Sequence, residues 1–138
     1  MISSKIDEIK KTLPSSVVLV AVSKTKPAEM IEQAMKNGHL DFGENKVQEL
    51  VDKHSTLPKN INWHMIGHLQ RNKVKYIAPF IHLIHGVDSE RLLIEINKQA
   101  KKNNRNIDCL LQFHIAKEST KFGFNMYEIY EIFERKKL

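Results

Sequence analysis

The chain has 138 residues, of which 41% are hydrophobic and 28% charged, and 22 Lys plus Arg against 16 Asp plus Glu give a net charge of +6. This length predicts a single domain over residues 1–138, with too much apolar material for a disordered chain. No run approaches the ~20 apolar residues of a membrane-spanning helix, and no apolar signal segment follows Met1. The lone cysteine, Cys109, excludes an internal disulfide and a cysteine-based zinc site, and we expect it in the core. We therefore expect a globular protein of the cytoplasm without a membrane partner.

The positive charge suggests nucleic-acid binding, because basic surfaces attract phosphate groups. The basic residues cluster instead at two expected helix ends, within 101–105 and 135–137, without interleaved aromatic residues. Solvated helix ends account for them, so we expect no specific nucleic-acid partner. Binding by charge alone stays open, and salt-dependent binding to arbitrary duplexes would support it.

In chain order, helical and strand periods alternate. An amphipathic helix over residues 2–13 is closed by Pro14, and the β-branched run 17–22 predicts a strand covered on both faces. Pro27 opens a second helix that ends at Gly38. Further strands are expected at residues 40–42, 61–66, 80–84 and 109–115. Four further helices are expected. One contains Val47 and Leu50, one spans residues 69–76, one contains Leu92 and Ile96, and one contains Ile129 and Ile132.

Two of these helices carry capping signals at their starts. Asp88 or Ser89 can cap the helix of Leu92, and Asn125 with Glu128 three residues later resembles a capping box. The total is one leading helix plus five βα units, typical of an open doubly wound sheet or a (β/α)8 barrel. Residues 22–27 lack the glycine-rich loop of a dinucleotide fold, and a complete barrel takes ~250 residues. As a barrel, this chain supplies about five of eight strands.

Polar residues stand at the expected carboxyl ends of the strands, where both folds bind ligands. Lys24 directly follows the apolar run 17–22, so we expect its stem in a partly buried barrel mouth, where desolvation disfavours the ammonium form. A neutral amine is a nucleophile that can form a Schiff base with an aldehyde. From its position alone, however, a solvated loop lysine is the favoured interpretation of Lys24.

Three long motifs follow one another in the chain. They are Ala-Val-Ser-Lys-Thr-Lys-Pro at 21–27, Asp-Phe-Gly-Glu-Asn at 41–45 with Val-Gln-Glu at 47–49, and Trp-His-Met-Ile-Gly-His-Leu-Gln at 63–70. These motifs resemble the pyridoxal-phosphate homeostasis protein family, which is similar to the barrel domain of bacterial alanine racemase. The resemblance continues through residues 85–88 and 117–123. It implies an α/β fold of the (β/α)8 TIM-barrel type with about the first five βα units.

The resemblance implies that Lys24 forms a Schiff base with pyridoxal 5′-phosphate. It places Lys26 near the cofactor entrance. Lys121 matches a second lysine of the family, linked to cofactor exchange or secondary binding. No residue is predicted to bind a metal.

The resemblance also implies that Asn45, and His64 or Gly67, lie close to the cofactor. From the residues alone, Asn45 can equally be a helix cap, and His64 can equally be a core imidazole whose hydrogen bonds are satisfied. Gly67 can be a turn residue. The sequence departs from the family pattern at two places: Gly86 stands where Ser or Thr is common, and His114 where Asn is common.

The family carries or regulates pyridoxal phosphate without established turnover, so the implied partners are the cofactor and pyridoxal-phosphate-dependent apo-enzymes. Racemisation needs a second acid or base on the opposite face of the ligand, which alanine racemase takes from another domain. Tyr76, Tyr127 and Tyr130 lie in expected helices, where we expect them to pack. A weak racemase or transaminase is the alternative, which Lys24-dependent hydrogen exchange at the α-carbon of alanine would reveal.

The family continues with strands six to eight, which carry a loop around the cofactor phosphate and an arginine facing the pyridine nitrogen. No counterpart of these segments follows Leu138 in the sequence. We therefore expect an incomplete barrel that has the covalent anchor without the phosphate site. Unpaired backbone groups at its outer strands predict self-association.

Overall fold

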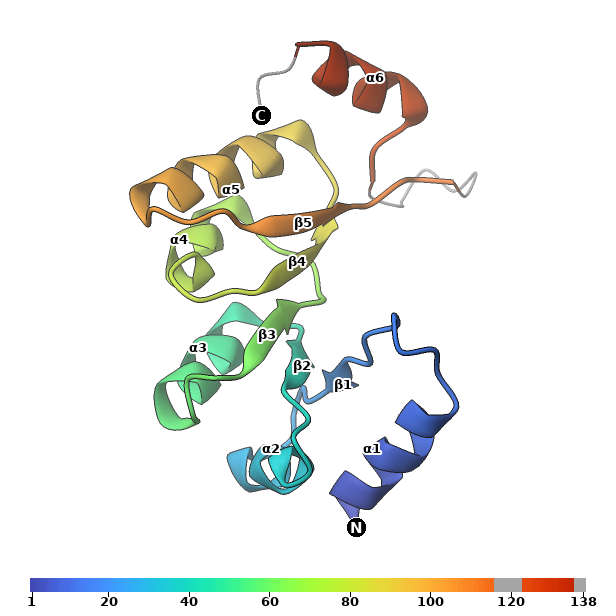
Figure 1. Ribbon diagram of the computed structural model, residues 1–138. Helices are drawn as coiled ribbons and strands as arrows, with labels where there is room; N and C mark the ends of the chain where they lie inside the picture. The colour runs from blue at the N-terminus through green and yellow to red at the C-terminus, as the bar shows by residue number, and fades with distance from the viewer. Residues whose placement is uncertain (116–122, 136–138) are drawn as a thin grey trace.

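A five-stranded parallel sheet forms the centre of the computed structural model, which describes residues 1–115 and 123–135 (Figure 1). Its strands are β1 (Ala21–Val22), β2 (Asp41–Glu44), β3 (Asn62–Met65), β4 (Leu83–Val87) and β5 (Asp108–Leu111). Their spatial order, β1-β2-β3-β4-β5, is their order in the chain. A doubly wound sheet reverses its strand order, whereas a barrel adds each strand beside the last. The predicted barrel-type arrangement is therefore confirmed, with five strands in the described residues.

Helices follow the strands, and α3, α4 and α5 lie along one side of the sheet in Figure 1. The helices are α1 (Ile2–Lys11), α2 (Ala28–Met35), α3 (Val47–Thr56), the 3-10 helix η1 (Arg71–Lys73), α4 (Val74–Ile77), α5 (Glu90–Lys102) and α6 (Met126–Arg135). Among the described residues, none of them has the length and apolarity to cross a membrane.

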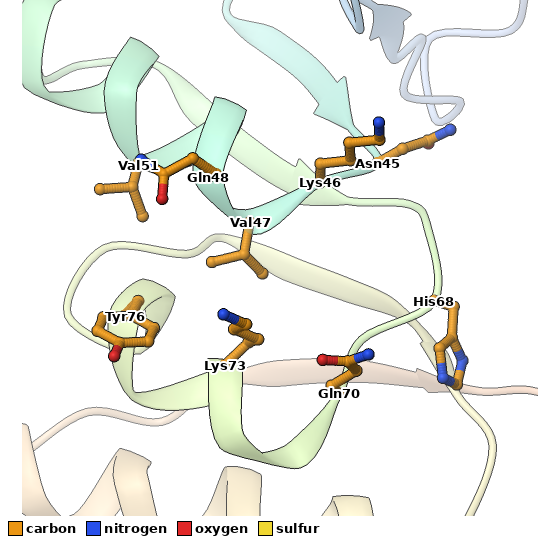
Figure 2. Close-up of a pocket in the computed structure, with 9 residues that line it drawn as sticks. All are labelled: Asn45, Lys46, Val47, Gln48, Val51, His68, Gln70, Lys73 and Tyr76. Atoms are coloured by element: carbon orange, nitrogen blue, oxygen red, sulfur yellow. The ribbon is translucent and has the colours of Figure 1, made fainter.

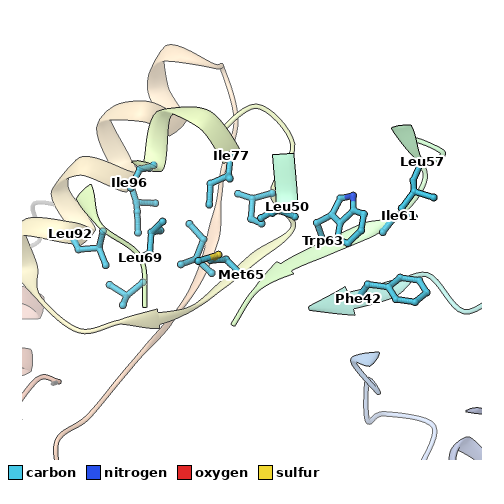
Figure 3. Close-up of a cluster of buried hydrophobic side chains, with 14 of the residues drawn as sticks. Phe42, Leu50, Leu57, Ile61, Trp63, Met65, Leu69, Ile77, Leu92 and Ile96 are labelled. Carbon is cyan, nitrogen blue, oxygen red and sulfur yellow. The ribbon is translucent and has the colours of Figure 1, made fainter. Parts of the chain in front are cut away.

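The hydrophobic core lies between the sheet and these helices (Figure 3). Phe42 and Trp63 extend from β2 and β3 on the same face as Leu50, Ile77 and Ile96 from the helices, and all five are at most 2% exposed. Alternate strand residues point to opposite faces. Because the face of Phe42 and Trp63 holds this core, the residues next to them in the strands, Gly43 and His64, point to the opposite, inner face of the sheet.

The first strand is shorter and more exposed than the sequence predicts. Only Ala21 and Val22 of the run 17–22 form β1, and the side chains of Val18 and Val22 are 64% and 55% exposed. Within the described residues, β1 pairs with β2 alone. The prediction of a strand covered on both faces is therefore wrong here, because a β-branched run reports strand preference and not the layers around it.

Three further boundaries differ from the prediction. The apolar residues 80–84 suggest a strand, but Phe80 and Ile81 donate their N–H groups to the carbonyl of Ile77 and so end α4 in a turn. Residues 69–76, expected as one helix, divide into η1 and α4. At the other strand, β5 stops at Leu111. The N–H of Gln112 still donates to the carbonyl of Val87, but its carbonyl accepts from the N–H of Phe124, and the N–H of His114 donates to the carbonyl of Phe124.

Both capping predictions are confirmed. The N–H of Leu92 donates to Ser89 Oγ at 3.2 Å at the start of α5. At α6, the N–H of Glu128 donates to Asn125 Oδ1 at 2.9 Å, and the N–H of Asn125 donates to Glu128 Oε1 at 3.3 Å. This reciprocal pair is the capping box, and it needs only residues three apart, which explains why sequence alone located it.

Cys109 is half-buried and packs against the core, as expected. Burial, with the neighbouring Asp108, raises the pKa of its thiol to about 11. The thiol is therefore protonated at neutral pH and is a poor nucleophile.

Candidate functional site

Lys24 lies in the turn between β1 and α2, at the carboxyl end of the sheet. Ahead of it, the N–H of Ser23 donates to the carbonyl of Gly43 at 3.0 Å, and the N–H of Lys26 closes the turn on the carbonyl of Ser23 at 3.1 Å. Thr25 adopts a φ of 62°, in the left-handed region that non-glycine residues rarely occupy. Its N–H donates to Glu49 Oε2 at 2.6 Å, which holds this conformation. The backbone is thus anchored on both sides of Lys24.

The side chains of Lys24 and Lys26 are both exposed. The expectation of a partly buried, desolvated Lys24 is therefore wrong in this structure. It assumed walls around the carboxyl end of β1, but β1 has a neighbouring strand on one side only within the described residues. An aldehyde in solution can reach the amine of Lys24 directly.

A buried network of charges lies on the helix side of the sheet behind this turn. Lys53 Nζ, from α3, donates to the carbonyl oxygen of Ser23 at 2.7 Å, to Glu44 Oε2 at 2.8 Å and to Glu49 Oε2 at 2.7 Å. Ser23 Oγ also donates to Glu44 Oε2. Glu44 is 0% exposed and Lys53 is 7% exposed. All three ammonium hydrogens of Lys53 have acceptors, one of which belongs to the residue that precedes Lys24.

The two carboxylates of this network differ in their electrostatics. Burial raises the pKa of Glu44, and the hydrogen bonds from Lys53 and Ser23 oppose that rise. The hydrogen bond from Lys53 lowers the pKa of Glu49. Sequence reasoning missed Lys53 as a support of the site. The spacing of Glu49 and Lys53, four residues apart on a helix, was an available signal for their pairing.

Asn45 and Gly67 meet where β2 and β3 end. A Cβ atom added to Gly67 would lie 2.5 Å from the carbonyl oxygen of Asn45, so only glycine fits this approach. The interpretation of Gly67 as a turn residue misses this contact. The N-cap of α3 is Lys46, so Asn45 is not the helix cap that the sequence allowed. Continuing the register Val22↔Gly43 by two residues places Lys24 level with Asn45.

His64 lies deeper in the sheet than these three residues. It pairs in register with Gly43, two residues before Asn45, which is about 7 Å along the strand. His64 is 2% exposed, its Nε2 is 2.9 Å from Asp41 Oδ1, and its Nδ1 is 2.9 Å from His85 Nε2. The structure therefore brings Lys24, Asn45 and Gly67 to one level and gives His64 separate partners. Lys121 lies outside the described residues.

A pocket of about 480 Å³ opens beside the same strand ends, between α3 and the η1–α4 segment (Figure 2). Asn45 and Lys46 line one part of it, and Lys73 extends toward Val47 in the figure. Lys73 Nζ also lies 5.9 Å from the centroid of the Tyr76 ring. The other residues that line the pocket are Gln48, Val51, His68 and Gln70. Asn45 thus lines this pocket on the helix side of the sheet and also lies level with Lys24 along the strands.

Residues 1–137 match the family described as alanine racemase, N-terminal domain. The chain belongs to this family. A relative within the predicted group is the pyridoxal phosphate homeostasis protein of Aquifex aeolicus, 41% identical over 117 residues, which are 84% of this chain and 51% of that protein. The chain spans about half the length of the curated relatives it matches. The family predicted from the motifs is confirmed.

Solved structures agree with this family assignment. PipY of Synechococcus elongatus without PLP gives a TM-score of 0.91 at 31% identity, covering 98% of this chain and 64% of PipY. The PLP-bound form of PipY gives 0.87 at 31% identity, with 99% and 64% covered. An alanine racemase from E. faecalis, 16% identical, gives 0.74 over 97% of this chain and 37% of the racemase, and so shares the fold.

Proposed function

We propose that this chain binds pyridoxal 5′-phosphate through Lys24 and handles the cofactor without turning over a substrate. The observation that carries the proposal is the anchored turn that presents the exposed amine of Lys24 at the carboxyl end of β1, level with Asn45. The names of the relatives and the PLP-bound form of PipY support it. Partnership with pyridoxal-phosphate-dependent apo-enzymes, in the cytoplasm, belongs to the same proposal.

The residues at the strand ends fit the aldehyde end of the cofactor. When bound, the cofactor would offer an aldehyde carbon to Lys24 Nζ, and their condensation would release one water. Lys26, exposed in the same turn, adds a positive charge that favours a phosphate dianion nearby. Asn45 offers an amide at the same level, and Gly67 lets the strand ends approach behind it. The role of Lys121 remains a prediction from the family resemblance.

The tyrosines considered as acid or base do not pack as the sequence predicts. Tyr76, Tyr127 and Tyr130 are 51%, 72% and 64% exposed, on α4 and α6. Racemisation needs a proton donor and acceptor held on opposite faces of the bound ligand. An exposed phenol on a helix surface is not held in that way, so none of these three tyrosines is a suitable acid or base.

The test is chemical trapping of the cofactor on the chain. After incubation with pyridoxal phosphate, borohydride reduction and peptide mapping should place the adduct on Lys24. Lys24→Arg, which keeps the charge but cannot form the bond, should abolish the adduct and leave the far-ultraviolet circular dichroism unchanged. Lys26→Arg is the matched control and should retain the adduct.

An adduct located mainly on Lys26 or Lys73 would overturn the assignment of Lys24. The absence of turnover is tested separately in deuterium oxide with alanine and the loaded chain. Exchange of the α-hydrogen that disappears in Lys24→Arg would overturn that half of the proposal and favour a weak racemase or transaminase.

A further inference from the structure

Three side chains with metal-binding atoms converge where β2, β3 and β4 lie side by side. Asp41 is the first residue of β2, His64 lies in β3, and His82 directly precedes β4. One ligand atom from each lies within 4.8 Å of the other two. Two imidazoles and one carboxylate are the protein donors of many zinc sites that keep a fourth position open.

The ring of His64 is already oriented for such a site. Its Nε2 is 2.9 Å from Asp41 Oδ1 and faces the cluster, while its Nδ1 is 2.9 Å from His85 Nε2. A histidine that binds a metal through one nitrogen usually donates its other N–H to an acceptor, which fixes the tautomer and the ring plane. With a metal on His64 Nε2, the Nδ1–H would donate to His85 Nε2 in the tautomer of His85 that carries its proton on Nδ1, and the burial of His64 restricts rotation of the ring toward solvent.

The cluster is also accessible to an ion. His82 is exposed, and the side chain of Asp41 is 22% exposed, against 3% for His64. In a tetrahedral zinc site, ligand atoms are about 3.3 Å apart, as zinc–ligand distances of about 2.0 to 2.1 Å require. Asp41 and His64 are near that separation, so closure requires only a movement of the exposed His82, whose ring centroid is 5.2 Å from that of His64.

We propose that Asp41, His64 and His82 bind one divalent transition-metal ion, and that Zn²⁺ is the ion best matched to this donor set. The site is distinct from the level of Lys24. Asp41 precedes Asn45 by four residues, which is about 13 Å along an extended strand. The proposal therefore does not rest on the proposed function. It revises the prediction that no residue binds a metal. That prediction missed the site because positions 41, 64 and 82 form no sequence motif.

The test is a calorimetric titration of the untagged chain, free of pyridoxal phosphate, with ZnCl₂ in a non-chelating buffer at pH 7. We expect one Zn²⁺ per chain. His82→Gln and Asp41→Asn should each weaken binding by about tenfold or more. His82 is exposed, so its replacement should leave the fold intact, which far-ultraviolet circular dichroism checks. His68→Gln, which replaces an exposed histidine outside the cluster, is the matched control and should bind as the unmodified chain does.

A second measurement reports the geometry of the site. Co²⁺ bound by these three residues and a water should give the intense visible bands of four-coordinate cobalt, and His82→Gln should lose them. The proposal is overturned if the unmodified chain takes up no Zn²⁺, or if His82→Gln and Asp41→Asn bind it with unchanged affinity. A loss of binding in His68→Gln as large as in His82→Gln would also overturn it, by placing the ion elsewhere.

Discussion

The charge of Lys53 connects α3 to the turn that carries Lys24. Its ammonium group joins the fully buried Glu44 to the carbonyl of Ser23 and thereby couples α3 to the turn that carries Lys24. A buried carboxylate that loses its cation is left with its desolvation cost uncompensated. We infer that Lys53 positions Lys24 indirectly, through the backbone of Ser23.

Replacing Lys53 by Met should destabilise the chain by about 3 kcal/mol at neutral pH, because it strands the buried carboxylate of Glu44. Urea denaturation at pH 8 measures the loss. Adding Glu44→Gln to Lys53→Met removes the stranded charge and should recover part of the stability, as a double-mutant cycle would show. A double variant no more stable than Lys53→Met would contradict the charge argument.

The same variant should show a pH dependence with a defined sign. Because burial raises the pKa of folded Glu44, its contribution to stability is present at low pH and is lost as pH rises through that value. The lowered pKa of Glu49 contributes stability above its ordinary value, and Lys53 is the first cause of that lowering. Without the hydrogen bond from Lys53, the pKa of Glu44 rises further, so the loss in Lys53→Met should be larger at pH 8 than at pH 5. The Glu49 contribution is already present at pH 5 and adds to the loss at both values. An equal loss at the two pH values would count against the Glu44 argument.

At the scale of elements, two glycines let the carboxyl ends of β2, β3 and β4 approach one another closely. A Cβ on Gly67 would meet backbone atoms of Asn45 at 2.5 and 2.9 Å, and neither strand end can yield without moving its neighbours. A Cβ on Gly86 would approach the carbonyl oxygen of Gly67 at 3.3 Å, a milder contact. Gly86 therefore offers a graded comparison within the same row of strand ends.

Gly67→Ala should destabilise the chain by about 1 to 3 kcal/mol through overpacking, and should lower the yield of the Lys24 adduct. Gly86→Ala should have a smaller effect on both. Thermal and urea denaturation give the stabilities, and the borohydride assay gives the adduct. Equal stabilities for Gly67→Ala and the unmodified chain would show that the strand ends tolerate separation.

At the scale of the whole molecule, the sheet has two outer strands. Within the described residues β1 and β5 each pair on one side only, and apolar side chains are exposed at or near both, with Val18 64%, Val22 55% and Leu110 48% exposed. Unpaired strand edges with apolar side chains favour pairing with another chain. The self-association predicted from the sequence stays a prediction, and we expect it to use these outer strands.

We expect this 138-residue chain to associate in a concentration-dependent way in sedimentation velocity experiments. Lysine at Val18 and Leu110 together should shift it toward the monomer, because charges on outer strands oppose pairing. Ile94→Lys, at a 52% exposed position on α5, is the matched control and should leave association unchanged. A monomer at every concentration, or equal effects of the control, would exclude association through the outer strands.

Local pattern alone was sufficient for the order of the elements and the place of Lys24, and the resemblance of three motifs indicated the family. The capping box at Asn125, the helix stop at Gly38 and the position of Lys24 after an apolar run depend on residues close together in the chain. Such features follow from helical and strand periods and from backbone chemistry, which a sequence displays directly.

Only the tertiary structure decided what surrounds those residues. The exposure of Lys24, the support of its turn by Lys53 and the meeting of Asp41, His64 and His82 depend on which strands and helices lie side by side. The residues concerned are 18 to 41 positions apart, so no local period connects them. Burial and charge pairing are properties of neighbours in space, and packing brings those neighbours together.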